Sequence, residues 1–331
     1  MSTSLTAALI SFALTAAAVP LIIPLLHRLR MGQAERELGP ESHLKKAGTP
    51  TMGGVAMILS VGAALVITDR FRTASLSLGY VIVFVYGLIG FLDDYIKVVQ
   101  KGLMEKAGAK TDASLGIRAS HKMVLQILAA AALAFYAREV TGTSILLPFT
   151  MSSFDLGWAY VPFVMFVLVA VTNAVNLTDG LDGLAAGSTL IVMIFFTSVS
   201  LFLGLSELAL MPAAVMGACL GFLCYNFNPA RIFMGDTGSM ALGAALAVTA
   251  VFTRTELFIV TAGLLFVIET VSVIMQVGYF KLTHGKRIFR MAPIHHHFEL
   301  CGWPETRVVT VFWIFTAVCV MLSMIMAHIS F

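Results

Sequence analysis

Ten long apolar segments, separated by short polar ones, constrain this chain more than any other feature of its sequence. Each is close to the roughly 20 residues that a helix needs to cross a bilayer core about 30 Å thick. With 59% hydrophobic and 12% charged residues, the 331-residue chain has too little polar surface for a soluble globule. We therefore predict an all-α integral membrane protein. The predicted spans are 5–27, 51–69, 75–92, 122–138, 158–177, 183–204, 207–226, 238–253, 256–280 and 307–328.

The distribution of lysine and arginine predicts the orientation of these spans. Ten spans place both termini on one side of the membrane. The loops of the opposite side, counted with Lys122 and Arg307 at two helix ends, hold 17 of the 21 lysine and arginine residues. The positive-inside rule makes that side cytoplasmic, so both termini face outward. These cytoplasmic loops are 28–50, 93–121, 178–182, 227–237 and 281–306.

No predicted loop is long enough to form a separate soluble domain, so residues 1–331 are predicted to form one membrane domain. Five aspartates gather on the cytoplasmic side, in the loops or at helix ends. A secondary transporter would instead place its ionisable groups near the bilayer midplane, where only Glu269 is predicted to lie. The pattern therefore favours an enzyme site at the inner face. Its acids are Asp93, Asp94, Asp179, Asp182 and Asp236.

The first polar motif, Asp93-Asp94-Tyr-Ile-Lys97, directly follows a predicted span. If the helix continues through it, Asp93 and Lys97 share a face at i,i+4, which alone could be a solvated salt bridge. Adjacent carboxylates repel each other, and such a pair suits a metal ion or general-base catalysis. The motif is therefore a candidate catalytic site that needs partners from elsewhere.

The second motif repeats polar residues every three positions, at Asn176, Asp179 and Asp182. This spacing predicts one helical or turn-like face that carries an amide and two carboxylates. Gly180 and Gly183 allow a tight turn and close approach of a phosphate or sugar. The alternative is a plain polar hairpin.

The third motif surrounds Asp236 at the start of the predicted span 238–253, where an N-cap role is the ordinary expectation. Two neighbours in the same loop favour ligand binding. Phe233 could stack on a base, and Arg231 could contact a phosphate.

The fourth motif is the run His295-His296-His297. Three consecutive side chains point in different directions, so they are not expected to bind one metal ion together. They are better suited to bond phosphate oxygens or to orient a carboxylate, and a surface histidine run is the alternative. Among the basic residues, Lys46, five residues before Thr51, and Lys122 are best placed to bind an anion at a helix end.

Oxygen ligands for Mg²⁺, surplus cations and glycine turns together are what phosphoryl transfer requires. The strings DDYIK, NAVNLTDGLDG, FMGDTGS and PIHHHFE, in this order, resemble the polyprenyl-phosphate N-acetylhexosamine-1-phosphate transferase superfamily. The resemblance covers nearly the whole chain and is closest to the branch that handles phospho-MurNAc-pentapeptide.

The resemblance implies a bacterial inner-membrane enzyme that transfers phospho-MurNAc-pentapeptide from its UDP-linked form to undecaprenyl phosphate. Its products would be lipid I and UMP, its cofactor Mg²⁺ and its assembly a homodimer. The sibling branch, which uses UDP-GlcNAc, is the alternative. Direct attack of the lipid phosphate is the expected mechanism, and a covalent aspartyl intermediate is its rival.

Residue roles also follow from the resemblance. Asp236 is implied as the principal Mg²⁺ ligand with Asn176 near the same ion, and Asp93 as the general base toward the lipid phosphate, supported by Asp94 and Lys97. The remaining implied contacts are with substrate. The nucleotide is contacted by Lys46, Asp179 and Phe233, and the sugar-phosphate side by His295 and His296. Asp182 is implied in the pocket wall, and further binding residues are Thr51, Lys122 and His297.

Overall fold

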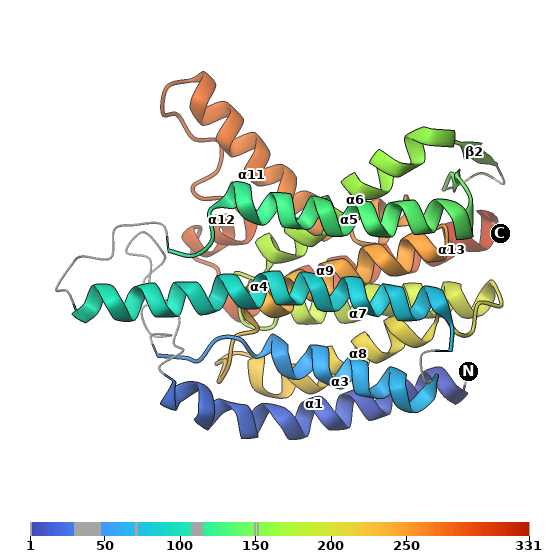
Figure 1. The fold of residues 1–331 in the computed structure, drawn as a ribbon. Coiled ribbons are helices and arrows are strands. Elements are labelled where there is room, and N and C mark those ends of the chain that lie inside the picture. Colours follow the sequence, from blue (N-terminus) through green and yellow to red (C-terminus); the bar gives the residue numbers. More distant parts are fainter. Residues whose placement is uncertain are drawn as a thin grey trace.

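Ten long helices form the body of the protein in the computed structural model, which describes residues 2–29, 48–69, 72–106, 115–148, 150 and 152–330 (Figure 1). They correspond one to one with the ten predicted spans. They are α1 (Ser2–Arg28), α3 (Gly54–Thr68), α4 (Ala74–Lys106), α5 (Ala119–Thr141), α6 (Tyr160–Thr178), α7 (Leu184–Phe202), α8 (Leu210–Asn226), α9 (Gly235–Phe252), α11 (Leu264–Leu282) and α13 (Glu305–Ser330).

Eight of these helices are long and apolar enough to cross a membrane, and α3 and α8 are shorter apolar helices. The predicted class, an all-helical integral membrane protein, is confirmed. Both termini lie at the same end of the bundle (Figure 1). The inside–outside orientation and the exact number of spans stay predictions.

The structure differs from the predicted elements in three places. The helix predicted to end at residue 92 continues as α4 to Lys106, because residues 93–106 include many strong helix formers. The predicted span 256–280 is interrupted at Gly263, which separates α10 (Phe258–Ala262) from α11. The predicted loop 281–306 contains a short helix, α12 (Ile294–Leu300).

A small hairpin, β1 (Ser144–Leu146) paired antiparallel with β2 (Ser153–Asp155), precedes the 3₁₀ turn η1 (Gly157–Ala159). The hairpin lies at the end of the bundle that carries both termini (Figure 1).

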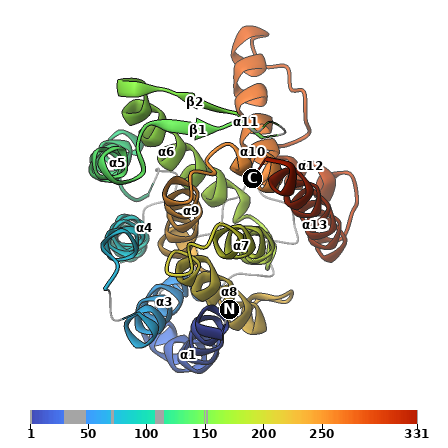
Figure 2. The same ribbon diagram turned by 90° about the vertical axis from the view of Figure 1, so that its right-hand side faces the viewer.

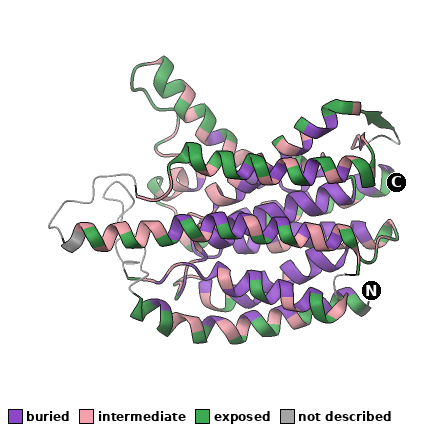
Figure 3. Cartoon of the chain, in the orientation of Figure 1, coloured by how far each residue is buried: buried purple, intermediate pink, exposed green. Residues whose placement is uncertain are grey.

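Helix α9 occupies the centre of the bundle, with α4, α6, α7 and α8 around it (Figure 2). Every residue from Thr237 to Phe252 is buried, whereas α1, α5 and α11 present much exposed surface (Figure 3). Close approach needs small residues, since dispersion between well-fitted surfaces drives helix packing in lipid. Gly90 of α4 lies directly against the carbonyl group of Asp236, and Gly54 of α3 lies against Gly238.

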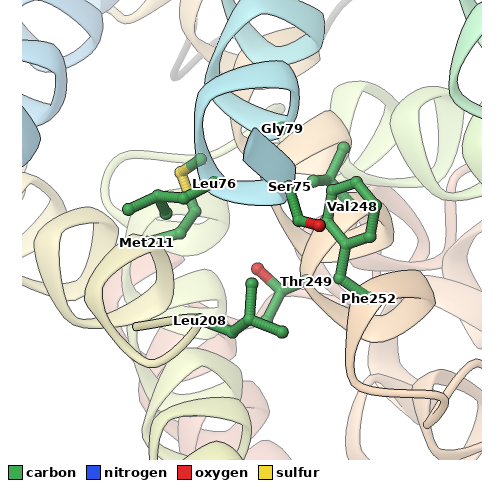
Figure 4. Close-up of a pocket in the computed structure, with 8 residues that line it drawn as sticks. All are labelled: Ser75, Leu76, Gly79, Leu208, Met211, Val248, Thr249 and Phe252. Carbon is green, nitrogen blue, oxygen red and sulfur yellow. The ribbon is translucent and has the colours of Figure 1, made fainter. Parts of the chain in front are cut away.

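The bundle is closely packed at the end that carries the termini. Between α4, α8 and α9 the structure leaves a cavity of about 10 Å³, into which the hydroxyl groups of Ser75 and Thr249 point (Figure 4). Such a volume holds at most one water molecule. This cavity is therefore not a substrate site, and the polar motifs lie at the other end of α4 and α9.

Candidate active site

Two carboxylates and two ammonium groups meet where α4, α5 and α9 come together. Lys97 Nζ lies 2.8 Å from Asp93 Oδ2 and 3.0 Å from Asp236 Oδ2. Lys122 Nζ lies 3.3 Å from Asp93 Oδ2 and 2.6 Å from Asp236 Oδ2. Each lysine thus bridges the same two carboxylates. We call these four residues the acid–lysine cluster.

Both carboxylate oxygens of Asp93 have partners in the protein. Its side chain is 5% exposed, and Oδ1 accepts a hydrogen bond of 2.7 Å from the backbone nitrogen of Ile117. The preceding residue, Gly116, donates its backbone hydrogen to Gln100 Oε1 at 2.8 Å. Gly116 has a φ of +102°, and a Cβ there would lie against Asp93 Oδ1. The chain before α5 therefore needs a glycine in order to close over this carboxylate.

Asp94 holds the first turn of α9 from a neighbouring helix. Its carboxylate accepts hydrogen bonds from the backbone nitrogens of Asp236 (3.2 Å) and Thr237 (3.0 Å) and from the Thr237 hydroxyl (2.8 Å). A carboxylate at a helix N-terminus satisfies free N–H groups and complements the helix dipole. Gly235, with φ +70°, gives Asp94 the space to approach. Asp94 therefore positions Asp236, which lies in the first turn of α9, after the N-cap residue Met234.

Asn176, on the last turn of α6, completes the surroundings of Asp236. Its Nδ2 donates to Asp236 Oδ1 at 2.9 Å and to Ser239 Oγ at 2.8 Å. Asp236 thus meets an amide on one oxygen and two ammonium groups on the other. The structure brings together six of the sequence-predicted site residues: Asp93, Asp94, Lys97, Lys122, Asn176 and Asp236.

Asp182 lies in a different cluster from Asn176. Helix α6 ends at Thr178, so the expected common face of Asn176, Asp179 and Asp182 is not formed. Asp182 Oδ2 accepts from Asn228 Nδ2 (3.1 Å) and from the backbone nitrogen of Ala230 (3.0 Å). Asp179, which follows the end of α6, is partly buried.

Glu305, at the start of α13, ties the same loops together. It accepts from the backbone nitrogen of Asp182 at 2.7 Å and from Asn228 Nδ2 at 3.1 Å. Asn226 adds a second connection, because its Oδ1 accepts from the backbone nitrogen of Gly183 at 3.0 Å and its Nδ2 donates to the Ile232 carbonyl at 2.9 Å. The loop between α6 and α7 is therefore fixed to the loop between α8 and α9.

The three consecutive histidines have three separate hydrogen-bond partners, although the rings of His295 and His296 lie side by side with centroids 4.1 Å apart. His295 Nδ1 lies 3.0 Å from Glu269 Oε2, and His296 Nδ1 lies 2.8 Å from Glu299 Oε2. His297 Nδ1 accepts from the backbone nitrogen of Arg290 at 3.2 Å. They do not form a common metal site.

His295 is fully buried together with Glu269. The imidazole Nε2 has no hydrogen-bond partner among the described residues and lies against Gly180, where a Cβ would collide with the ring. The pair therefore supports the loop between α6 and α7 from behind. The expected role of His295 at the sugar phosphate stays a prediction.

The segment before α3 runs beside the loop that carries Phe233. The backbone nitrogen of Phe233 donates to the Pro50 carbonyl at 2.8 Å, and that of Gly53 donates to the Phe233 carbonyl at 2.9 Å. This pairing brings Thr51 beside Gly235, so Thr51 is close to Asp94 and Asp236. The remaining predicted binding residue, Lys46, lies outside the described residues.

A cavity of about 550 Å³ lies between α1, residues 48–50 and the loop that connects α8 and α9. None of the five aspartates lines it. Its lining residues are Pro20, Ile23, His27, Gly48, Thr49, Pro50, Tyr225 and Arg231.

Sequence reasoning did not select several residues that shape the site. Glu305, Asn226, Thr237 and Ser239 were not candidates, and Glu269 was expected to be hydrogen-bonded inside the bundle without a part in the site. Thr237 and Ser239 follow Asp236 closely, so the register of α9 could have suggested them. Glu305 is 123 residues from its partner Asp182, and no local signal could have found it.

The donor set fits a hard divalent cation better than a soft one. No group of three or more histidine, cysteine, aspartate or glutamate side chains in the described ranges could hold a metal ion. Asp93 Oδ2 and Asp236 Oδ2, however, both lie within 3.3 Å of the same two ammonium groups, so two carboxylate oxygens converge where positive charge is already bound. Carboxylate oxygens are preferred by Mg²⁺, and lysine side chains near them suit phosphate oxygens.

Comparison with known proteins agrees with this chemistry. The family model described as glycosyl transferase family 4 matches residues 76–254, and a phospho-N-acetylmuramoyl-pentapeptide-transferase signature matches residues 46–58. The phospho-N-acetylmuramoyl-pentapeptide-transferase of Clostridioides difficile (strain 630) is 47% identical over 324 residues and that of Thermoanaerobacter sp. (strain X514) 47% over 319, each over 96% of both chains. The enzyme of Geobacillus thermodenitrificans is 48% identical over 309 residues, covering 92% of this chain and 91% of its own. The chain therefore belongs to the phospho-N-acetylmuramoyl-pentapeptide-transferase family.

Proposed function

We propose that this protein transfers phospho-MurNAc-pentapeptide from UDP-MurNAc-pentapeptide to undecaprenyl phosphate, with release of UMP. The observation that carries the proposal is the acid–lysine cluster, in which two carboxylates and two lysines converge at one end of a membrane bundle. Both substrates carry phosphate groups, and cations next to carboxylates suit the transfer of such groups. One substrate is a lipid, which agrees with a site at a membrane face.

Asp93 is proposed as the base that keeps the lipid phosphate deprotonated, and Lys97 and Lys122 as the groups that hold both substrates' phosphates. An oxygen of the lipid phosphate then forms a bond to the phosphorus that carries MurNAc. The bond from that phosphorus to the oxygen of UMP breaks, and UMP leaves with the bonding electrons. Asp94 and Asn176 take no part in these steps and keep Asp236 in place.

Mg²⁺ belongs to the same proposal, with Asp236 as the principal ligand and Asn176 near it. When bound, the ion would neutralise charge on the pyrophosphate. Asp179 and Phe233 are proposed at the nucleotide with Lys46, and His296, His297 and Thr51 beside the rest of the donor. In this proposal the protein lies in a bacterial inner membrane, where the site faces the cytoplasm and both termini face the outside. The protein forms a homodimer.

Product identification tests the function. Purified protein incubated with undecaprenyl phosphate and either UDP-MurNAc-pentapeptide or UDP-GlcNAc should yield, by mass spectrometry, a lipid product from the first donor only. Product from UDP-GlcNAc alone would show that the protein has the activity of the sibling branch. No product from either donor would contradict the proposal.

An exchange assay tests the mechanism. Direct attack requires the lipid acceptor, so labelled UMP should not enter UDP-MurNAc-pentapeptide when undecaprenyl phosphate is absent. Exchange without the acceptor would instead indicate a covalent aspartyl intermediate, in which the enzyme itself accepts the phosphoryl group.

A further inference from the structure

The C-terminal half of α11 stands apart from the rest of the protein. Its buried residues are Leu265, Phe266, Glu269 and Ser272, and no residue after Ser272 is buried. Figures 1 and 2 show this half projecting away from the bundle. Most of its side chains are nevertheless apolar: Ile274, Met275, Val277, Tyr279, Phe280 and Leu282 are all exposed. In a membrane protein, such a face without a protein neighbour is suited to contact lipid.

The projecting helix ends in a group of basic residues. Lys281, Lys286, Arg287 and Arg290 are all exposed, and the sequence from 270 to 298 contains no aspartate or glutamate. Within the described part of the chain, none of the four forms an ion pair with a carboxylate. Four positive charges at one protruding end are therefore left without compensation by the described acidic residues.

Gln276 keeps these charges beside the apolar helix. Its Oε1 accepts hydrogen bonds from the backbone nitrogens of Ile288 (3.1 Å) and Phe289 (2.9 Å), and its Nε2 donates to the Phe289 carbonyl at 3.2 Å. The chain after α11 consequently folds back along the helix, through a turn at His284 and Gly285 with positive φ. The result is a fixed arrangement and not an extended loop.

Two large apolar side chains lie among the cations. Leu282 is 81% exposed and Ile288 is 44% exposed. We call the set Lys281, Leu282, Lys286, Arg287, Ile288 and Arg290 the basic tip. Basic residues interleaved with exposed apolar ones are the composition of elements that lie at the headgroup level of a membrane, with the apolar groups inserted and the cations at the phosphates.

We infer that the basic tip binds the headgroups of anionic phospholipids at the membrane face that carries the acid–lysine cluster. The apolar helix places the tip at the bilayer surface, and the uncompensated charge selects anionic over zwitterionic headgroups. The inference does not depend on which sugar nucleotide the enzyme uses. The tip is a lipid contact separate from the reacting groups.

A fluorescent probe at the tip tests the inference. The full-length protein carries His284→Cys as the labelling site, with the exposed cysteines Cys224 and Cys301 changed to serine. In detergent at low salt, phosphatidylglycerol should shift the probe emission at a concentration at least tenfold lower than phosphatidylcholine. Addition of 0.5 M NaCl should remove this preference, since salt screens exposed charges.

Charge removal supplies the second arm. We expect a triple variant to need on the order of a hundredfold more phosphatidylglycerol for the same response, and its substitutions are Lys286→Gln, Arg287→Gln and Arg290→Gln. Each cation near an anionic surface increases the affinity about fivefold. The control is Arg28→Gln with Lys101→Gln, which removes two cations from the same end of the bundle outside the tip. Its response should equal that of the unsubstituted tip.

Four results would overturn the inference: equal responses to the two lipids, a lipid preference that persists in 0.5 M NaCl, an equal loss in the control variant, or the same emission shift with inorganic phosphate alone. The last would identify a free-anion site. The salt arm uses the unsubstituted tip, so misfolding of the triple variant would not hide the answer.

Discussion

Carboxyl groups that are buried or partly buried lie at opposite ends of the bundle and have opposite surroundings. In the acid–lysine cluster, Asp93 and Asp236 share two ammonium groups at 2.6 to 3.3 Å. At the other end, Glu256 accepts a hydrogen bond of 2.8 Å from the Tyr160 hydroxyl on Oε1, while Oε2 is buried and has no hydrogen-bond partner in the part of the chain that the structure describes. Burial raises the pKa of Glu256 to about 7.

The difference shows what separates a reactive carboxylate from a structural one in this fold. A buried carboxylate stays charged only where cations compensate the loss of hydration. Glu256 has a neutral hydroxyl as its hydrogen-bond partner and carries a proton up to neutral pH. Asp93 and Asp236 have two cations, and the same cations can hold a phosphate. The chemistry of the protein is therefore expected at one end only.

Asp236→Asn should have the largest effect. It removes the charge that Lys97 and Lys122 both contact, so we expect lipid-linked product formation to fall by at least about a thousandfold at every Mg²⁺ concentration. The matched control is Asp155→Asn in the hairpin at the other end, which should keep full activity. Substantial turnover by Asp236→Asn would remove its metal and charge roles.

Lys122→Gln should rank second. Asp93 and Asp236 would lose one of their two shared cations, and we expect activity to fall by about a hundredfold. The same assay measures it, with Lys101→Gln as the control because Lys101 lies beyond the cluster on α4. If the two lysine variants behave alike, the cluster does not depend on Lys122.

Glu269→Gln tests whether the buried histidine only positions the site. The substitution keeps the shape of the side chain and removes its charge, so His295 and the loop around Gly180 should shift slightly. We expect KM for the UDP-linked donor to rise by about tenfold while kcat changes less, because misplacement of a binding loop weakens substrate alignment. Glu207→Gln, at the other end, is the control. A loss confined to kcat would point to direct chemistry by His295.

Asp182→Ala should be weaker again. It removes one of two acceptors of Asn228 Nδ2, which keeps Glu305, and the acceptor of the Ala230 backbone nitrogen. Leaving one such buried donor unpaired costs about 2 kcal/mol of unfolding free energy. Activity should fall by roughly fivefold, since Asp182 is assigned no chemical step. Steady-state rates and thermal unfolding in detergent measure the two effects, and complete inactivation of a folded variant would contradict this assignment.

Glu256→Gln should leave activity unchanged and alter only the pH dependence of stability. The raised pKa of Glu256 means that its stabilising contribution is full below about pH 4.5, its ordinary value, and is lost as the pH rises to about 7. The change across this window is about 3 kcal/mol. The melting temperature of the variant should change less between these pH values than that of the unsubstituted protein. The exposed Glu139→Gln variant should show the same pH dependence as the unsubstituted protein. An unchanged profile would show that Glu256 does not titrate in this range.

Whether a contact could be predicted from the sequence depends on how far apart its two residues lie along the chain. The pair Asp93 and Lys97 was predictable, because i,i+4 spacing on a continuous helix fixes their contact. The contact between Lys122 and Asp236 spans 114 residues, and that between Asp94 and Thr237 spans 143. No local pattern specifies such pairs. The motifs indicated only that these residues lie on the same side of the membrane.

The sequence by itself determined the membrane class, the ten helices and the gathering of acids at one end. These follow from hydropathy and from the requirement that every backbone polar group in lipid be satisfied within its own helix. Only the tertiary structure decided which acids meet lysines, that His295 is buried behind the site, and that α11 ends in an uncompensated basic tip. Those features depend on how glycine-lined helices approach one another, which is a property of three-dimensional packing and not of any single segment.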